Sequence, residues 1–189
     1  EGAPLEVPVA RDIVPNINRL ADTLRAAGGT VIWVQMTMTG SGSGAFSVYY
    51  KYFFQEEGRR KHLAALTEGS DLHGIYPELD VKPDEPVVLK NRFSALIQGS
   101  SRLDELCKGR GIDTLVVAGT LTNVCCESTV RDAMMLGYRA FMPADANAAL
   151  CDEEQLAALT SVALFFGDIR DTDGVIDLME KRAPRAQSA

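Results

Sequence analysis

The sequence predicts an α/β fold with a mostly parallel sheet covered by helices on both faces. Strand-like apolar runs alternate with helix-like segments along most of the chain. Runs such as 115–118 (LVVA) are apolar throughout, which is typical of strands buried on both faces. The chain has 189 residues and a hydrophobic fraction of 46%, which is enough for one real core. We therefore expect a single domain over residues 1–189.

The first half of the chain contains two predicted strands and an aromatic-rich insertion. A helix is expected over 11–27, with its apolar residues at helical spacing, and Gly28–Gly29 ends it. Strands are expected over 30–35 and 86–89, and a short helix over 58–70. Residues 37–61 open with glycine and serine and continue with clustered aromatics, which predicts a mobile loop acting as a lid or a subunit contact. A satellite apolar cluster under a surface loop explains the same pattern equally well.

The second half repeats the strand-then-helix pattern. Ser101 and Asp104 form a capping box that starts a helix. A strand over 114–119, a helix over about 125–136 and a strand over 139–142 follow. The next helix begins near residue 152, a short strand covers 168–170, and the last helix begins at Thr172. In the helix that begins near residue 152, helical spacing predicts an inner face of Leu156, Leu159, Ala163 and Phe166.

Composition excludes several classes of function. The formal net charge of −7 disfavours nucleic acid or an anionic membrane as the main partner. No apolar run approaches the roughly 20 residues that span a bilayer, and the four cysteines lack metal-ligand spacing, so we expect a cytoplasmic protein. His62 and His73 are expected at the surface, and no metal is predicted. No glycine-rich phosphate motif occurs, so no nucleotide or other cofactor is expected.

Cys125 is the strongest catalytic candidate. It lies just after the apolar strand 114–119, where a helix is expected to begin and backbone N–H groups favour an anion. Thr122 and Asn123 are candidate capping residues, and Lys90 is a candidate cation at the end of another strand. Parallel strands bring their carboxyl ends to one edge of the sheet, which is where sites lie in such folds. An inert core cysteine remains the alternative for Cys125, and Cys126 is expected in the core.

Three segments resemble the isochorismatase-like cysteine hydrolase superfamily. They are GTLTNVCCESTVRD (residues 119–132), VVLKNRFSA around Lys90 and PADA around Asp145, within a similarity that runs from about residue 5 to 180. The resemblance implies a Rossmann-like, three-layer α/β/α sandwich and an Asp–Lys–Cys triad. Cys125 matches the nucleophile and Lys90 the lysine. The Thr120–Leu121 bond matches a non-proline cis peptide, which would turn the N–H groups of Leu121 and Cys125 toward an oxyanion.

The aspartate of the implied triad has no match in this sequence. In the superfamily it lies at the end of the first strand, ahead of the loop before the first helix, and Asp12 resembles part of a helix start instead. We therefore expect that the first strand is missing from this chain and that an upstream segment of roughly 15–35 residues carries it. Without that central strand, its two neighbours would keep unpaired edges.

The resemblance is closest to the branch that hydrolyses linear ureido compounds such as biuret, ureidoacrylate and N-carbamoyl amino acids. Nicotinamide is disfavoured because residues 35–46 lack the metal-binding histidines, and isochorismate because its hydrolases lack the cysteine. Homo-oligomers and a small-molecule substrate are implied. A non-catalytic scaffold, or hydrolysis of another small amide, remains the alternative. Candidates for substrate binding, which could equally be surface or subunit-contact residues, are Asn91, Arg92, Phe46 and Tyr49.

Overall fold

The computed structural model describes residues 6, 7, 9–38 and 47–182. Its helices are α1 (Val14–Ala26), α2 (Ser47–Tyr52), α3 (Glu56–Leu66), α4 (Leu103–Gly109), α5 (Glu127–Met135), α6 (Asp152–Phe165) and α7 (Thr172–Arg182). Its strands are β1 (Trp33–Met36), β2 (Val87–Lys90), β3 (Thr114–Val116), β4 (Gly119–Thr120), β5 (Arg139–Pro143), β6 (Asn147–Ala148) and β7 (Asp168–Arg170). Strands and helices alternate as the sequence predicts, and most element ends agree within a few residues.

Every strand pair in the described part of the chain is parallel. The order is β1–β2 in one group, β3–β5–β7 in a second, and β4–β6 in a third that continues toward the carboxyl ends of β3 and β5. Within the described residues β1 and β3 each pair along one edge only. The expectation of a further strand between them stays a prediction.

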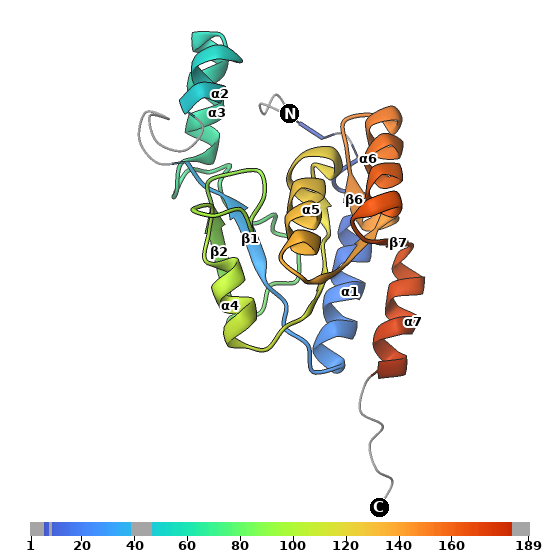
Figure 1. Ribbon diagram of the computed structural model, residues 1–189. Coiled ribbons are helices and arrows are strands. Elements are labelled where there is room, and N and C mark those ends of the chain that lie inside the picture. Colours follow the sequence, from blue (N-terminus) through green and yellow to red (C-terminus); the bar gives the residue numbers. More distant parts are fainter. Residues whose placement is uncertain (1–5, 8, 39–46, 183–189) are drawn as a thin grey trace, which may run out of the picture.

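Helices cover the sheet on two faces, which confirms the predicted α/β fold. One core cluster joins the sheet to α4, α5 and α6 through buried residues that include Cys107, Val130, Met142 and Val162. A second cluster, built around Leu20 and Val175, joins the sheet to α1 and α7. The pair α2–α3 extends away from these layers at the end where the strands finish (Figure 1). No helix in the described residues is both long and apolar enough to cross a bilayer.

The expected loop over residues 37–61 is largely helical instead. Residues 39–46 lie outside the described part, but α2 and α3 cover most of the remainder. His62, expected at the surface, is 7% exposed and its Nδ1 lies 2.9 Å from the Tyr50 hydroxyl. Burial lowers the pKa of His62. Aromatic contacts, such as that of Tyr50 with Phe54, pack the segment together. The glycine and serine content of the segment did not indicate this packing.

The inner face of helix α6 is only partly the one predicted: Leu159 and Phe166 pack against the core, but Leu156 and Ala163 do not. Leu156 is 68% exposed and Ala163 is also exposed, whereas Ala158 and Val162 are buried. The helix is apolar on both sides, so helical spacing could not decide which side faces the core. Packing against the turn before α5 selects the side with the smaller residues.

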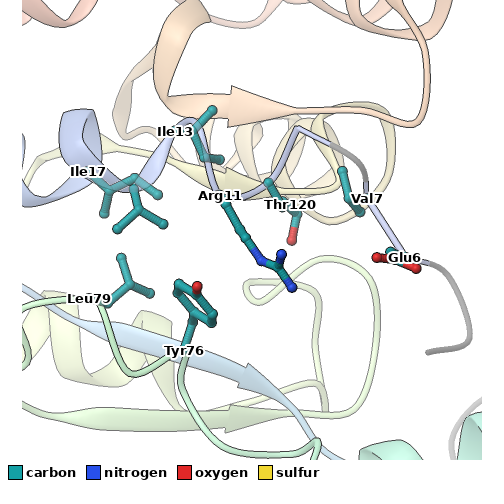
Figure 2. Close-up of a pocket in the computed structure, with 11 residues that line it drawn as sticks. Glu6, Val7, Arg11, Ile13, Ile17, Tyr76, Leu79 and Thr120 are labelled. Atoms are coloured by element: carbon teal, nitrogen blue, oxygen red, sulfur yellow. The ribbon is translucent and has the colours of Figure 1, made fainter. Parts of the chain in front are cut away.

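A cavity of about 320 Å³ lies between the two parts of the sheet. Figure 2 shows Ile13, Ile17 and Leu79 along it, with the Arg11 side chain extending into the space and Thr120 at its edge. Cys125 and Lys90 do not line it. The cavity is therefore lined by α1, the segment before it and β4, and it is separate from the thiol, although β4 leads to the cysteine turn.

Candidate active site

Cys125 lies in a widened helical turn between β4 and α5. The turn is a π-helix over Thr122–Cys126, and the peptide bond before it, Thr120–Leu121, is cis, as the resemblance implies. The helix thus begins three residues earlier than expected. Thr122 and Asn123 do not act as caps, because Leu121 holds the N-cap position and neither side-chain oxygen has a hydrogen-bond partner among the described residues. Single π-helical turns occur often at functional sites.

Lys90 brings its ammonium group to the Cys125 thiol. Its Nζ lies 3.2 Å from Cys125 Sγ and donates to the carbonyl oxygens of Arg92 and Phe93, at 2.9 Å each. A second sulfur, Met36 Sδ, lies 3.5 Å from the same nitrogen, so two carbonyl oxygens and two sulfurs share the three ammonium protons. Lys90 is 6% exposed, and no described carboxylate oxygen lies within 4.0 Å of its Nζ. Burying an ammonium requires polar partners, and the two carbonyl oxygens and Cys125 Sγ are among the partners that Lys90 has here.

The loop after β2 is held in place by its own hydrogen bonds. Ser100 Oγ donates to the Ser94 carbonyl at 2.6 Å, and Asn91 N–H donates to the Ser100 carbonyl at 3.1 Å. Thr129 links this loop to the cysteine turn, because its hydroxyl donates to the Cys125 carbonyl at 2.7 Å and accepts from Ala95 N–H at 3.1 Å. The carbonyls that orient Lys90 are therefore fixed relative to Cys125.

A group of aromatic rings lies near the Cys125 thiol. Tyr49 makes an edge-to-face contact with Phe93, with ring centroids 5.5 Å apart, and contacts Phe54 at 5.0 Å. Burial and the charge of a Cys125 thiolate both raise the pKa of Tyr49. Helix α2 thus brings Tyr49 near the Cys125 sulfur across a large sequence separation. Phe46, the other aromatic candidate, lies outside the described residues.

Asn91 and Arg92 lie beside Lys90, half-buried, and interact with each other. Arg92 Nη1 donates to the Asn91 side-chain oxygen at 2.8 Å and to its carbonyl at 3.0 Å. The Arg92 carbonyl also accepts from Lys90. These contacts place both residues next to the Lys90 ammonium. Their role in binding a substrate stays a prediction.

The remaining cysteines differ from Cys125 in their surroundings. Cys126 is 5% exposed, as expected for a core residue, and burial raises its pKa well above the usual range for a thiol. Burial also raises the pKa of Cys107. Cys151 is exposed at the start of α6. Only Cys125 combines partial exposure with a neighbouring ammonium among these four.

Asp145, part of the resemblance, has a structural role away from the thiol. Its Oδ1 accepts from the Thr172 N–H at 2.7 Å and from the Thr172 hydroxyl at 2.8 Å, and Asn16 donates to its Oδ2 at 3.1 Å. The carboxylate therefore ties α1 to the start of α7. No grouping of three metal-ligating side chains occurs among the described residues.

Two contributors to the site were not singled out from the sequence. Thr129 follows Cys125 by four residues, the spacing at which a helical hydroxyl reaches a carbonyl. That spacing was a usable signal. Phe93 makes two contacts: its carbonyl oxygen accepts a hydrogen bond from Lys90, and its ring packs against Tyr49. Both contacts depend on how the loop folds, so the sequence alone did not indicate them.

Comparison with known proteins finds a matching family model and several solved structures with the same fold. The isochorismatase domain model matches residues 1–174. A cysteine hydrolase from Pseudomonas syringae pv. phaseolicola is 28% identical with a TM-score of 0.84, over 94% of this chain and 84% of that one. An isochorismatase family protein from Desulfovibrio vulgaris is 27% identical with a TM-score of 0.79, over 95% and 90%. N-carbamoylsarcosine amidase from Thermoplasma acidophilum shares the fold, at 22% identity and a TM-score of 0.70, over 89% and 87%.

Proposed function

Because this chain belongs to the isochorismatase family and is a hydrolase of C–N bonds, we propose that Cys125 is its nucleophile and small linear ureido or amide compounds are its substrates. The observation that carries the proposal is the 3.2 Å contact between Lys90 Nζ and Cys125 Sγ in a half-buried position. An adjacent cation favours the thiolate, which is the nucleophilic form.

The proposed reaction has two stages. The Cys125 thiolate attacks the substrate carbonyl, and the C–N bond breaks to leave a thioester and release ammonia or an amine. Water then attacks the thioester (a thiocarbamate when the substrate is a ureido compound), the C–S bond breaks, and the carboxylic or carbamic acid leaves as the thiol is restored. Backbone N–H groups of Leu121 and Cys125 are the proposed donors to the oxyanion in both stages, since they follow the cis peptide Thr120–Leu121 at the start of the helix.

A carboxylate is needed to take the thiol proton and to deliver it to the leaving nitrogen. We propose an aspartate on a further strand between β1 and β3, as the resemblance implies. The unpaired edges of those two strands in the described part support this position, as does the cavity beside Thr120. Asp145 is not a candidate, because its oxygens are bonded to Thr172 and Asn16.

The ureido preference is tested with a panel of amides. Ammonia release from biuret, ureidoacrylate and N-carbamoyl amino acids should exceed that from nicotinamide, with kcat/KM at least about 100-fold higher for the best ureido compound. A pocket that bonds both nitrogens of a ureido group penalises an analogue lacking them by factors of this size or larger. Faster hydrolysis of nicotinamide would contradict the substrate class. No hydrolysis of any compound would favour the non-catalytic scaffold.

Tyr49 is proposed to contact the bound substrate. Tyr49→Ala should raise KM by about 3–10-fold while kcat changes little, because an aromatic contact contributes about 0.5–1.5 kcal/mol. Tyr49→Phe should retain a near-normal KM if the ring is what matters. Tyr52→Ala is the matched control, since Tyr52 lies on the same helix and is 68% exposed. Equal KM values for Tyr49→Ala and the control would exclude Tyr49 from the binding surface.

A further inference from the structure

Helix α6 presents an apolar face to solvent. Leu156 and Leu164 are 68% and 66% exposed, and the small residues between them on this side, Ala157, Thr160 and Ala163, are exposed as well. No charged residue occurs from Gln155 to Gly167. A surface helix normally carries charged groups on its outer side, so a contiguous apolar face indicates an interaction site. We call these five residues the α6 outer face.

The α6 outer face is symmetric about Thr160. Leu156 and Leu164 lie four residues on either side, and Ala157 and Ala163 lie three residues on either side. At 3.6 residues per turn, all five positions point within about 60° of the Thr160 direction. Small residues at the centre allow two helices to approach closely, and the outer leucines can each pack beside the partner's leucine. Such a surface is complementary to a second copy of itself related by a two-fold axis.

We propose that the α6 outer face packs against α6 of a second copy of this chain, antiparallel, about a two-fold axis at Thr160. The distribution of charge supports the antiparallel direction. The first turn of α6 holds Asp152, Glu153 and Glu154. An antiparallel pair keeps these two acidic turns at opposite ends, whereas a parallel pair brings them together.

Neighbouring apolar residues extend this surface. A stable dimer buries roughly 800 Å² per partner, which is more than one side of a 14-residue helix provides. At the end of α5, Met135 and Leu136 are 65% and 44% exposed. Helix α5 lies beside α6 (Figure 1) and is held to it by Arg131, which donates to Ser161 Oγ at 2.6 Å. The apolar surface therefore continues from α6 onto the end of α5.

Disulfide trapping tests the position of the axis. In a Cys151→Ser background, Thr160→Cys should form a covalent dimer on mild oxidation, because the axis brings the two copies of residue 160 together. Leu156→Cys is the matched control. In the proposed pairing its two copies lie about 12 Å apart along the helices, at 1.5 Å per residue, beyond the reach of a disulfide. Efficient cross-linking of Leu156→Cys without Thr160→Cys would overturn the proposed register.

Solution mass tests whether this face makes the dimer. Light scattering should give at least twice the mass of one chain for the unmodified protein and the mass of one chain for Leu156→Glu/Leu164→Glu, with unchanged circular dichroism. Val48→Glu is the control, because Val48 is an equally exposed apolar residue (64%) on α2. A monomeric unmodified protein, or a dimer that survives the α6 double substitution, would exclude this interface. Loss of the dimer in Val48→Glu alone would assign the contact to α2.

Discussion

Cys125→Ala should abolish hydrolysis, with kcat reduced by a factor on the order of 10⁴ or more, as for other enzymes that lose their nucleophile. Cys125→Ser keeps the shape of the side chain but should be nearly as inactive, because Lys90 stabilises a thiolate and cannot ionise a hydroxyl to a useful extent. Intact-mass spectrometry during turnover should show the acyl adduct in the unmodified protein and in neither variant.

Alkylation distinguishes Cys125 from the other thiols in the same samples. Iodoacetamide should modify Cys125 fastest and Cys151 more slowly, while buried Cys107 and Cys126, whose pKa values are raised, stay unmodified in the folded protein. Cys151→Ser is the matched control and should keep full activity. A Cys125→Ala variant that still hydrolyses the substrate would mean that another group attacks the carbonyl.

Lys90→Met should lower kcat/KM by about 100- to 10,000-fold, the usual range for loss of a group that activates a nucleophile or stabilises developing charge. Methionine is unbranched and uncharged and is only one atom shorter than lysine, so the change removes the ammonium while filling most of the same space. Lys90→Arg should not restore activity. A planar guanidinium cannot donate to the Arg92 and Phe93 carbonyls and to sulfur with the geometry of an ammonium.

A second measurement separates this electrostatic role from loss of folding. The rate at which iodoacetamide alkylates Cys125 near neutral pH should fall in Lys90→Met, because less of the thiol is ionised, while the thermal unfolding transition remains cooperative. Lys82→Met is a surface control, since Lys82 is paired with Asp80 on an exposed loop. Unchanged alkylation together with near-normal turnover would remove Lys90 from the proposed mechanism.

Much of the fold could be predicted because strand and helix patterns are local. Apolar runs gave the positions of β2, β3 and β5, and the glycines after α1 gave its end. The same local signals were misleading where both sides of an element are apolar. For α6, spacing favoured a face with Leu156 and Ala163 inward, and the structure buries Ala158 and Val162 instead. The residues that faced outward then became the proposed interface.

The insertion over 37–61 shows a different limit. Its composition indicated a loop, and its order comes from contacts such as Tyr50 with His62, which join residues twelve positions apart. Composition records how many glycines and aromatics are present but not which of them meet. The position of Tyr49 near Cys125 follows from that packing, and no local pattern contains it.

The sequence by itself determined the α/β class and the family, and it indicated Cys125 as the candidate nucleophile and Lys90 as the candidate cation beside it. Those features depend on residue type and on position relative to a strand end, which are readable along the chain. Only the tertiary structure decided that Lys90 Nζ lies 3.2 Å from the sulfur, with two backbone carbonyls fixing its direction. It also decided which side of α6 is exposed to solvent. Both depend on how elements far apart in sequence pack, because packing sets distances and exposure that spacing along one segment does not define.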